Sequence, residues 1–165
     1  MGTQQILLIV LSVIIVGAAI AVGIQMFNAQ AYSANKSAIA ADAQSFASQI
    51  VQYYKTPTSQ GGAGGTLALG DEEKIANFIG WGSTTEGEET TYTMDNDNGK
   101  YLIAAVEDGA TTVTIYGLGN EDNGTNKPAI MTTITLPEGT IVGTPKDVDN
   151  EETITTLEVS DFEDK

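Results

Sequence analysis

The chain begins with one long apolar block. Residues 6–24 contain a single polar side chain, Ser12, and no charged side chain occurs before Lys36. At 1.5 Å per residue the block would form a helix of roughly 28 Å, close to the ~30 Å hydrocarbon core of a bilayer. A cleavable secretory signal would carry basic residues in front of its apolar core, and none precede this one. The pattern therefore predicts a helix that can cross a membrane.

The same helix is expected to continue with a different character. Residues 28–54 contain no Gly or Pro, and apolar side chains recur there at helical spacing, at Ile39, Ala43, Phe46, Ile50 and Tyr53. This spacing gathers them on one face, which predicts a helix of about 50 residues in all. Residues 1–27 would form its hydrophobic half, and residues 28–55 an amphipathic half that packs against a sheet.

A glycine-rich segment should end the helix. Residues 56–70 contain Pro57 and the run Gly-Gly-Ala-Gly-Gly at 61–65, which predicts a helix stop and a flexible connection. Three acids follow at 71–73. Acidic side chains favour the positive end of a helix, so a short helix reaching Ile79 is expected there.

Beyond this helix the apolar period changes to two. Alternating, β-branched and aromatic residues predict strands at 91–94, 101–106, 111–116 and 130–136. The turns at 95–99 and 108–110 have hairpin chemistry, and 120–127 reads as an exposed loop. We therefore expect an α+β protein in which residues 71–146 form a head with an antiparallel sheet of about four strands.

The last residues leave two interpretations open. Residues 139–146 are a candidate edge strand, and the alternation of residues 152–160 suggests another. The acids of residues 147–165 are equally typical of a tail, either mobile or clasping a neighbouring molecule.

Charge and missing residue types exclude several functions. The net charge is −15, and the sequence has no Cys, His or Arg. Acidic surfaces repel phosphate backbones, so no nucleic-acid partner is expected. Without Cys there is no disulfide or thiolate metal site, and without His the commonest general base is missing. We find no pairing of nucleophile and base and do not expect an enzyme.

The acidic loops offer weak candidates for ligands and modification. Asp95 and Asp97 could contribute oxygens to Ca²⁺, but the EF-hand pattern fails at Gly99, and hairpin-turn chemistry explains the same residues. No other cofactor is expected. Asn123 lies in an Asn-Gly-Thr acceptor sequence within the exposed loop and is a candidate for glycosylation.

The layout resembles that of type IV pilins and the related pseudopilins. The resemblance rests on the stretch from Met1-Gly2-Thr3-Gln4-Gln5 through the apolar block to Tyr54, followed by a small β-rich head. It implies that Met1 is a processed and methylated N-terminus. It also places Gln5 at the register position where the family usually carries Glu. Cleavage after Gly2, which would put Leu7 fifth, is a second interpretation.

The resemblance further implies a helical homopolymer drawn from an inner-membrane pool. Its partners would be further copies of the chain, the inner membrane before assembly and the pilus assembly machinery. The filament would lie outside the cell, with the head as its outer surface for adhesion, motility or surface contact. Gly17 and Gly23 would allow either close helix packing or local melting of the helix. The polymer core would be formed by Ile6, Leu7, Leu8, Leu11, Ile14, Ile15, Ile20, Val22 and Ile24.

Two other functions fit the same sequence. One is a pseudopilin, the short fibre subunit of a secretion or DNA-uptake system. The other, from a different class, is a single-pass membrane-anchored extracellular binding module that acts as a monomer. A filament long enough to shear from cells would favour the pilin, and a monomer extracted only by detergent would favour the anchored module.

Overall fold

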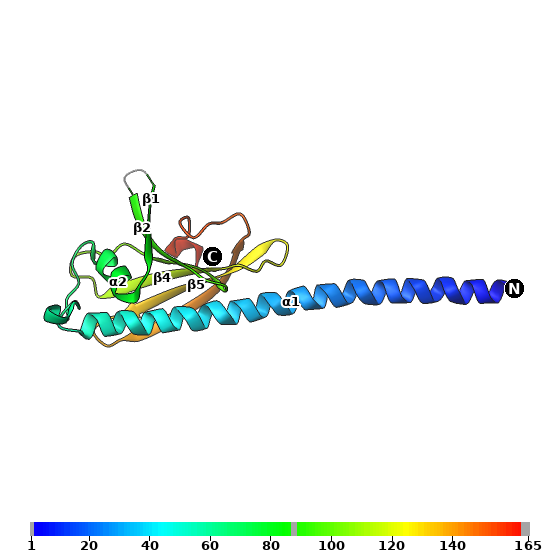
Figure 1. Cartoon of the computed structure of the whole chain (residues 1–165), viewed down its shortest axis with the longest axis horizontal. Helices are drawn as coiled ribbons and strands as arrows, with labels where there is room; N and C mark the ends of the chain where they lie inside the picture. Colours follow the sequence, from blue (N-terminus) through cyan, green and yellow to red (C-terminus); the bar gives the residue numbers. More distant parts are fainter. Residues whose placement is uncertain (1, 87–88, 163–165) are drawn as a thin grey trace.

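A computed structural model describes residues 2–86 and 89–162 of the chain. One helix, α1 (Thr3–Lys55), runs the length of the molecule and carries the rest of the chain as a head around its C-terminal half (Figure 1). At 1.5 Å per residue its 53 residues span about 80 Å. The head contains an antiparallel sheet, so the expected α+β layout is confirmed.

The sheet is a meander in which each strand pairs with the next along the chain. Six strands occur in the order of the sequence, so β1 and β6 form its two edges. A short helix, α2 (Asp71–Ile79), precedes the first strand, and two 3-10 turns occur at Thr58–Gln60 (η1) and Val159–Asp161 (η2). The strands are β1 (Gly82–Glu86), β2 (Glu89–Asp95), β3 (Gly99–Ile103), β4 (Thr112–Gly119), β5 (Asn126–Thr135) and β6 (Thr140–Asp149).

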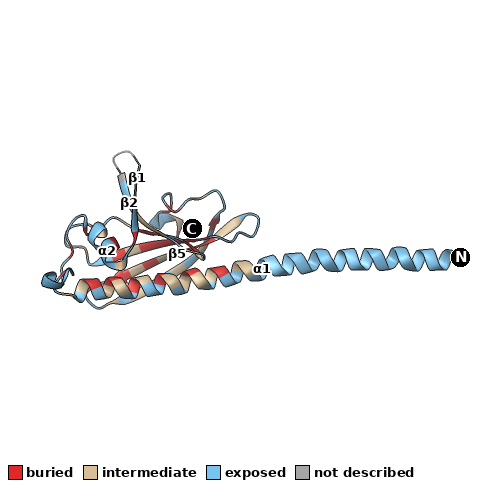
Figure 2. Cartoon of the chain, in the orientation of Figure 1, coloured by how far each residue is buried: buried red, intermediate tan, exposed pale blue. Residues whose placement is uncertain are grey.

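The main core lies between α1 and one face of the sheet. Figure 2 shows buried residues on the half of α1 that faces the strands and none on the half that projects. The expected apolar face is confirmed: four of its five members are fully buried and Phe46 is partly buried against them. Phe46 contacts the rings of Trp81 and Tyr101 edge-on, each at 5.0 Å between centroids. These contacts join the helix to the start of β1 and to β3.

A second, smaller core covers the opposite face of the sheet. The C-terminal segment crosses that face and buries Ile154, Leu157 and Phe162 against residues that include Leu102 and Tyr116. The edge strand suggested for 152–160 is therefore not formed. The three anchors stand three and five positions apart, a spacing that period-two alternation cannot place on one face of a strand. Turns and η2 present them to the sheet instead.

The sheet has one strand that was not expected, and other strands begin or end at different residues. β1 was not expected, because the sequence Gly-Ser-Thr-Thr-Glu has no apolar side chain to alternate. β5 begins at Asn126 and shortens the expected loop. The candidate edge strand at 139–146 is confirmed as part of β6.

The glycine-rich segment folds back on the end of α1. The N–H of Ala63 donates to the carbonyl of Tyr53 at 3.1 Å, and that of Gly65 donates to Tyr54 at 2.9 Å. A Cβ at Gly62 would clash with the carbonyl of Thr56, so only glycine permits this approach. Ala63 and Leu67 are buried. The segment is thus a packed loop on the helix C-terminus, where an extended flexible connection was expected.

Candidate assembly surface on the first half of helix α1

The projecting half of α1 exposes an apolar surface on every side. Residues 2–30 are all exposed, and α1 is long and apolar enough to cross a membrane. The predicted core residues belong to this surface and are between 48% and 68% exposed: Ile6, Leu7, Leu8, Leu11, Ile14, Ile15, Ile20, Val22 and Ile24. Met26 and Phe27 extend the surface toward the head.

The energetic cost of this exposure shows that the segment needs an apolar surrounding. Burying one large aliphatic side chain is worth about 1.5–3 kcal/mol, so the nine predicted core residues together represent roughly 14–27 kcal/mol. A whole domain is stable by only about 5–15 kcal/mol. An apolar surrounding, such as lipid or other apolar helices, would remove this cost.

The head begins at a polar contact on the first buried residue of α1. Asn35 donates from Nδ2 to the carbonyl of Asn98 at 2.7 Å, and its Oδ1 accepts the N–H of Glu121 at 3.4 Å. A Cβ at Gly119 would overlap the Asn35 amide, so glycine is required there for the side chain to fit. This contact marks where the projecting half of the helix ends.

At the next residue of α1, an ion pair connects the helix to the edge of the sheet. The ammonium of Lys36 lies 2.6 Å from an oxygen of Asp147 in β6. The hydrogen bond from Lys36 lowers the pKa of the Asp147 carboxyl, against the effect of desolvation, and Tyr32 adds to the lowering. Both partners of the ion pair are partly exposed, so the pair contributes at most about 1 kcal/mol.

Asp42 is the polar centre of the contact between helix and sheet. Its Oδ2 accepts hydrogen bonds from Asn98 Nδ2 at 2.8 Å, from the Tyr101 hydroxyl at 2.9 Å and from Asn96 Nδ2 at 3.0 Å. Desolvation raises the pKa of Asp42, but these three hydrogen bonds outweigh it and the net pKa lies below the usual range. The helix is thereby held to the β2–β3 turn.

Neither Asn35 nor Asp42 was among the predicted site residues. Asp42 is the only acid before Asp71, and it lies next to the buried face of the helix. A single carboxylate beside the buried face of a helix was the sequence signal that could have identified Asp42 as a contact residue. Its partners are 54 to 59 positions away in the sequence, so the sequence pattern could not name them.

The other predicted site residues of α1 lie on its projecting half, where a neighbouring helix can pack against them. Gln5 is in the first turn, and its N–H donates to the carbonyl of Gly2 at 2.9 Å. Gly17 and Gly23 have no atom within 4 Å of a built Cβ, so both positions are open to a neighbouring molecule. Met1, the predicted processing site, lies outside the described residues.

The acidic loops are organised as turns. Asp95 is paired with Lys100 at 3.4 Å, and Asp97 is exposed in the β2–β3 turn. Within residues 2–86 and 89–162, no group of three acidic side chains is arranged to hold a metal ion. The Asn123 side-chain oxygen accepts the N–H groups of Thr125 and Asn126, so it caps its own loop. Glycosylation of Asn123 stays a prediction.

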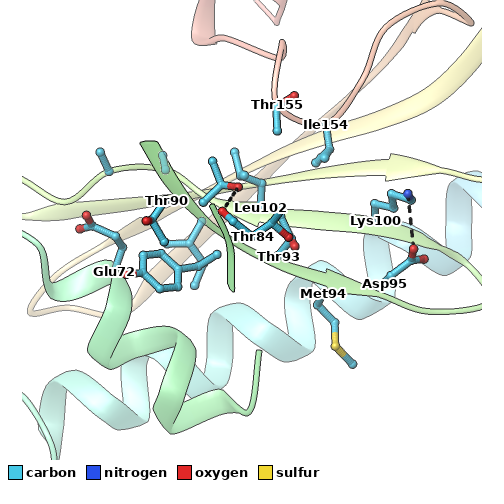
Figure 3. A pocket seen from close by; sticks show the side chains of 15 residues that line it. Glu72, Thr84, Thr90, Thr93, Met94, Asp95, Lys100, Leu102, Ile154 and Thr155 are labelled. Atoms are coloured by element: carbon cyan, nitrogen blue, oxygen red, sulfur yellow. Dashed lines mark hydrogen bonds and ion pairs between the residues drawn. The ribbon is translucent and has the colours of Figure 1, made fainter. Parts of the chain in front are cut away.

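A groove of about 670 Å³ lies between β2, β3 and the C-terminal segment (Figure 3). Threonines of the β1–β2 hairpin, Leu102 of β3 and Ile154 of the C-terminal segment line it (Figure 3). Its charged groups already have partners: Asp95 pairs with Lys100, and Glu72 accepts the N–H of Val106 at 3.0 Å. The groove offers threonine hydroxyls and apolar side chains to a ligand.

Comparison with models of protein families, with curated proteins and with solved structures finds no match for this chain.

Proposed function

We propose that this chain is the major structural subunit of an extracellular filament of the type IV pilus kind. The observation that carries the proposal is that one continuous helix has an exposed apolar half and a second half that packs in the head. Residues 3–30 of this helix are all exposed and mainly apolar, whereas its last 20 residues pack in the core of the head. A subunit that moves from bilayer to polymer needs such a helix.

The assembly step follows from the apolar surface. In the membrane, lipid surrounds residues 6–24. On assembly, the same side chains of neighbouring subunits replace the lipid, so the surface stays out of water throughout. A heterologous contact that repeats without closing produces a fibre. The uncharged Gln5 adds little desolvation cost to this packing, and its amide can still accept or donate hydrogen bonds.

The head would form the outer surface of the filament and carry no catalysis. Its net negative charge keeps closely spaced copies soluble in water. The polar contacts of Asn35 and Asp42 hold it at a set position along the helix. Assembly in the cell would need an inner-membrane pool and the assembly machinery of such filaments.

The test is imaging and mass spectrometry of material sheared from the source cells. The proposal expects fibres that contain this chain, with an N-terminal peptide that begins at methylated Met1. If the chain is found only in membranes, as an unmodified monomer released by detergent, the proposal is wrong and the anchored binding module is favoured. Short fibres confined to the envelope would favour the pseudopilin.

A further inference from the structure

The two edges of the sheet differ in how they are protected against pairing. Natural edge strands are usually blocked by charged residues, prolines, bulges or covering segments. The second half of β6 has such protection, from Pro145, Lys146 and Asp147. Its first half, Thr140–Thr144, is uncharged, and β1 at the other edge is uncharged from Gly82 to Thr85.

The backbone groups on the open half of β6 point outward. The N–H of Asn150 donates to the carbonyl of Thr125, which makes these two residues a hydrogen-bonded pair of the β5–β6 ladder. Bonded and non-bonded pairs alternate in an antiparallel ladder. Ile141 and Gly143 therefore direct their N–H and C=O groups away from β5. Pro145, which has no N–H, falls in the same outward set, as expected for an edge proline.

The same reasoning places outward groups on β1. Asn96 donates to Gly99 at the β2–β3 turn, and this sets the alternation along β2. Ser83 and Thr85, opposite Tyr92 and Thr90 of β2, then face outward from β1. The residues from Gly82 to Thr85 are all exposed.

Length and charge match the two open edges to each other. The open half of β6 offers five uncharged residues, Thr140–Thr144, and β1 offers four, Gly82–Thr85. Two copies of a chain with a net charge of −15 repel each other wherever their acidic loops meet. Repulsion between copies is weakest at these uncharged edges. Their outward backbone N–H and C=O groups can form hydrogen bonds with another strand. Val142, which is 55% exposed, adds an apolar side chain to the open half.

We propose that the heads of neighbouring copies of this chain pair through their sheet edges. The open half of β6 in one copy adds to β1 of the next. Because the two edges lie on opposite sides of one sheet, the contact is heterologous and repeats from copy to copy. The pairing goes beyond the filament proposed above, because copies held by α1 in one membrane could meet in the same way.

Cysteine cross-linking of the full-length chain tests the pairing directly. The natural sequence has no Cys, so two introduced thiols report on one contact. Ser83→Cys with Val142→Cys, treated in cells with a short bis-maleimide, should give a ladder of dimers, trimers and longer products. Each single variant should give no ladder. Ser83→Cys with Asp108→Cys, which places the second thiol on an exposed loop away from the edges, is the control.

Two outcomes overturn the proposal. A ladder no stronger than that of the control pair shows that the edges do not meet. A single dimer from Val142→Cys alone shows that β6 pairs with β6 in a closed arrangement. Imaging of the same cells separates this test from that of the filament. Filaments without a ladder contradict the edge pairing alone, and a ladder without filaments contradicts the proposed function alone.

A charge placed on the open half gives an independent check. In a Ser83→Cys/Thr140→Cys chain, Val142→Lys should abolish the ladder. Val159→Lys is the matched control, because Val159 is 50% exposed but lies on η2, away from both edges. Trp81 fluorescence during unfolding in denaturant verifies that each variant folds. An unchanged ladder in a folded Val142→Lys variant overturns the proposal.

Discussion

The carboxylate of Asp42, in the C-terminal half of α1, accepts a hydrogen bond of 2.9 Å from the hydroxyl of Tyr101 in β3. Tyr101 is fully buried, and its ring also contacts Phe46 on the next turn of the helix. Burial, followed by the hydrogen bond and the charge of Asp42, raises the pKa of Tyr101 far above its usual value. The pair therefore stays as phenol and carboxylate across the physiological pH range, and it locks the helix to the sheet.

Removing the Asp42 charge should destabilise the head. Asp42→Ala leaves the Tyr101 hydroxyl and two Asn amides without their acceptor, which we expect to cost about 1–3 kcal/mol. Denaturant unfolding of the detergent-solubilised chain, followed by Trp81 fluorescence, measures it. In a double-mutant cycle with Tyr101→Phe the two losses should be less than additive, because both variants remove one contact. Full additivity would contradict the coupling.

The same carboxylate should make the head sensitive to acid. The pKa of Asp42 is lower in the folded chain than the ~3.9 of an unfolded Asp. Its contribution is therefore fully present above about pH 4 and is lost as the pH falls through the folded pKa. Asp42→Asn should flatten the decline of stability in that window and leave the decline due to Asp147 unchanged. An unaltered acid profile in Asp42→Asn would contradict this assignment.

The C-terminal segment should be an integral part of the head. Leu157 is 4% exposed in the second core, so Leu157→Ala should lower the free energy of unfolding by about 2–5 kcal/mol. Val159→Ala, at an exposed position two residues away, should change it by less than about 0.5 kcal/mol. Denaturant unfolding compares the two variants. Equal stabilities would mean that residues 150–162 behave as a tail in solution.

Gln5 should act in assembly as a neutral packing residue. Gln5→Leu should still assemble, whereas Gln5→Lys should block assembly, because it would bury an unpaired charge. The yield of sheared filaments measures both. Gln52→Lys, on the exposed polar side of the same helix, controls for added charge. Filaments at the natural yield from Gln5→Lys would contradict the packing role.

Gly17 should serve close helix packing. A Cβ at Gly17 would contact nothing in the described residues beyond the adjacent backbone of its own helix, so neither Gly17→Ala nor Gly17→Leu should alter the unfolding of the head. In filaments, we expect the alanine variant to assemble and the leucine variant to lose yield, because the larger side chain keeps neighbouring helices apart. If alanine alone abolishes assembly, its higher helix propensity points to local melting at Gly17 instead.

Repeating local patterns made most of the fold predictable. The apolar block of residues 6–24 can be recognised from composition alone, because a helix this apolar is unfavourable in water. The spacing of Ile39, Ile50 and Tyr53 likewise predicted which face of α1 is buried. The acids at 71–73 predicted the start of α2, and period-two alternation predicted the central strands near their observed positions.

The features that sequence reasoning missed depend on contacts with residues outside their own segment. β1 has no apolar alternation and exists because β2 pairs with it. The C-terminal segment looked like a strand or tail because its three anchors make sense only against the second face of the sheet. The glycine-rich loop likewise looked flexible until the end of α1 was in place to receive it.

The long helix, its division into apolar and amphipathic halves, and the β-rich acidic head can all be predicted from the sequence alone. Those properties follow from side-chain chemistry repeated at the period of one helix or strand. The tertiary structure was needed to show where the head contacts the helix, through Asn35 and Asp42, and which strands form the open edges of the sheet. These depend on hydrogen bonds and strand pairings between residues far apart in the chain, and the loops that bring such residues together leave no periodic signal in the sequence.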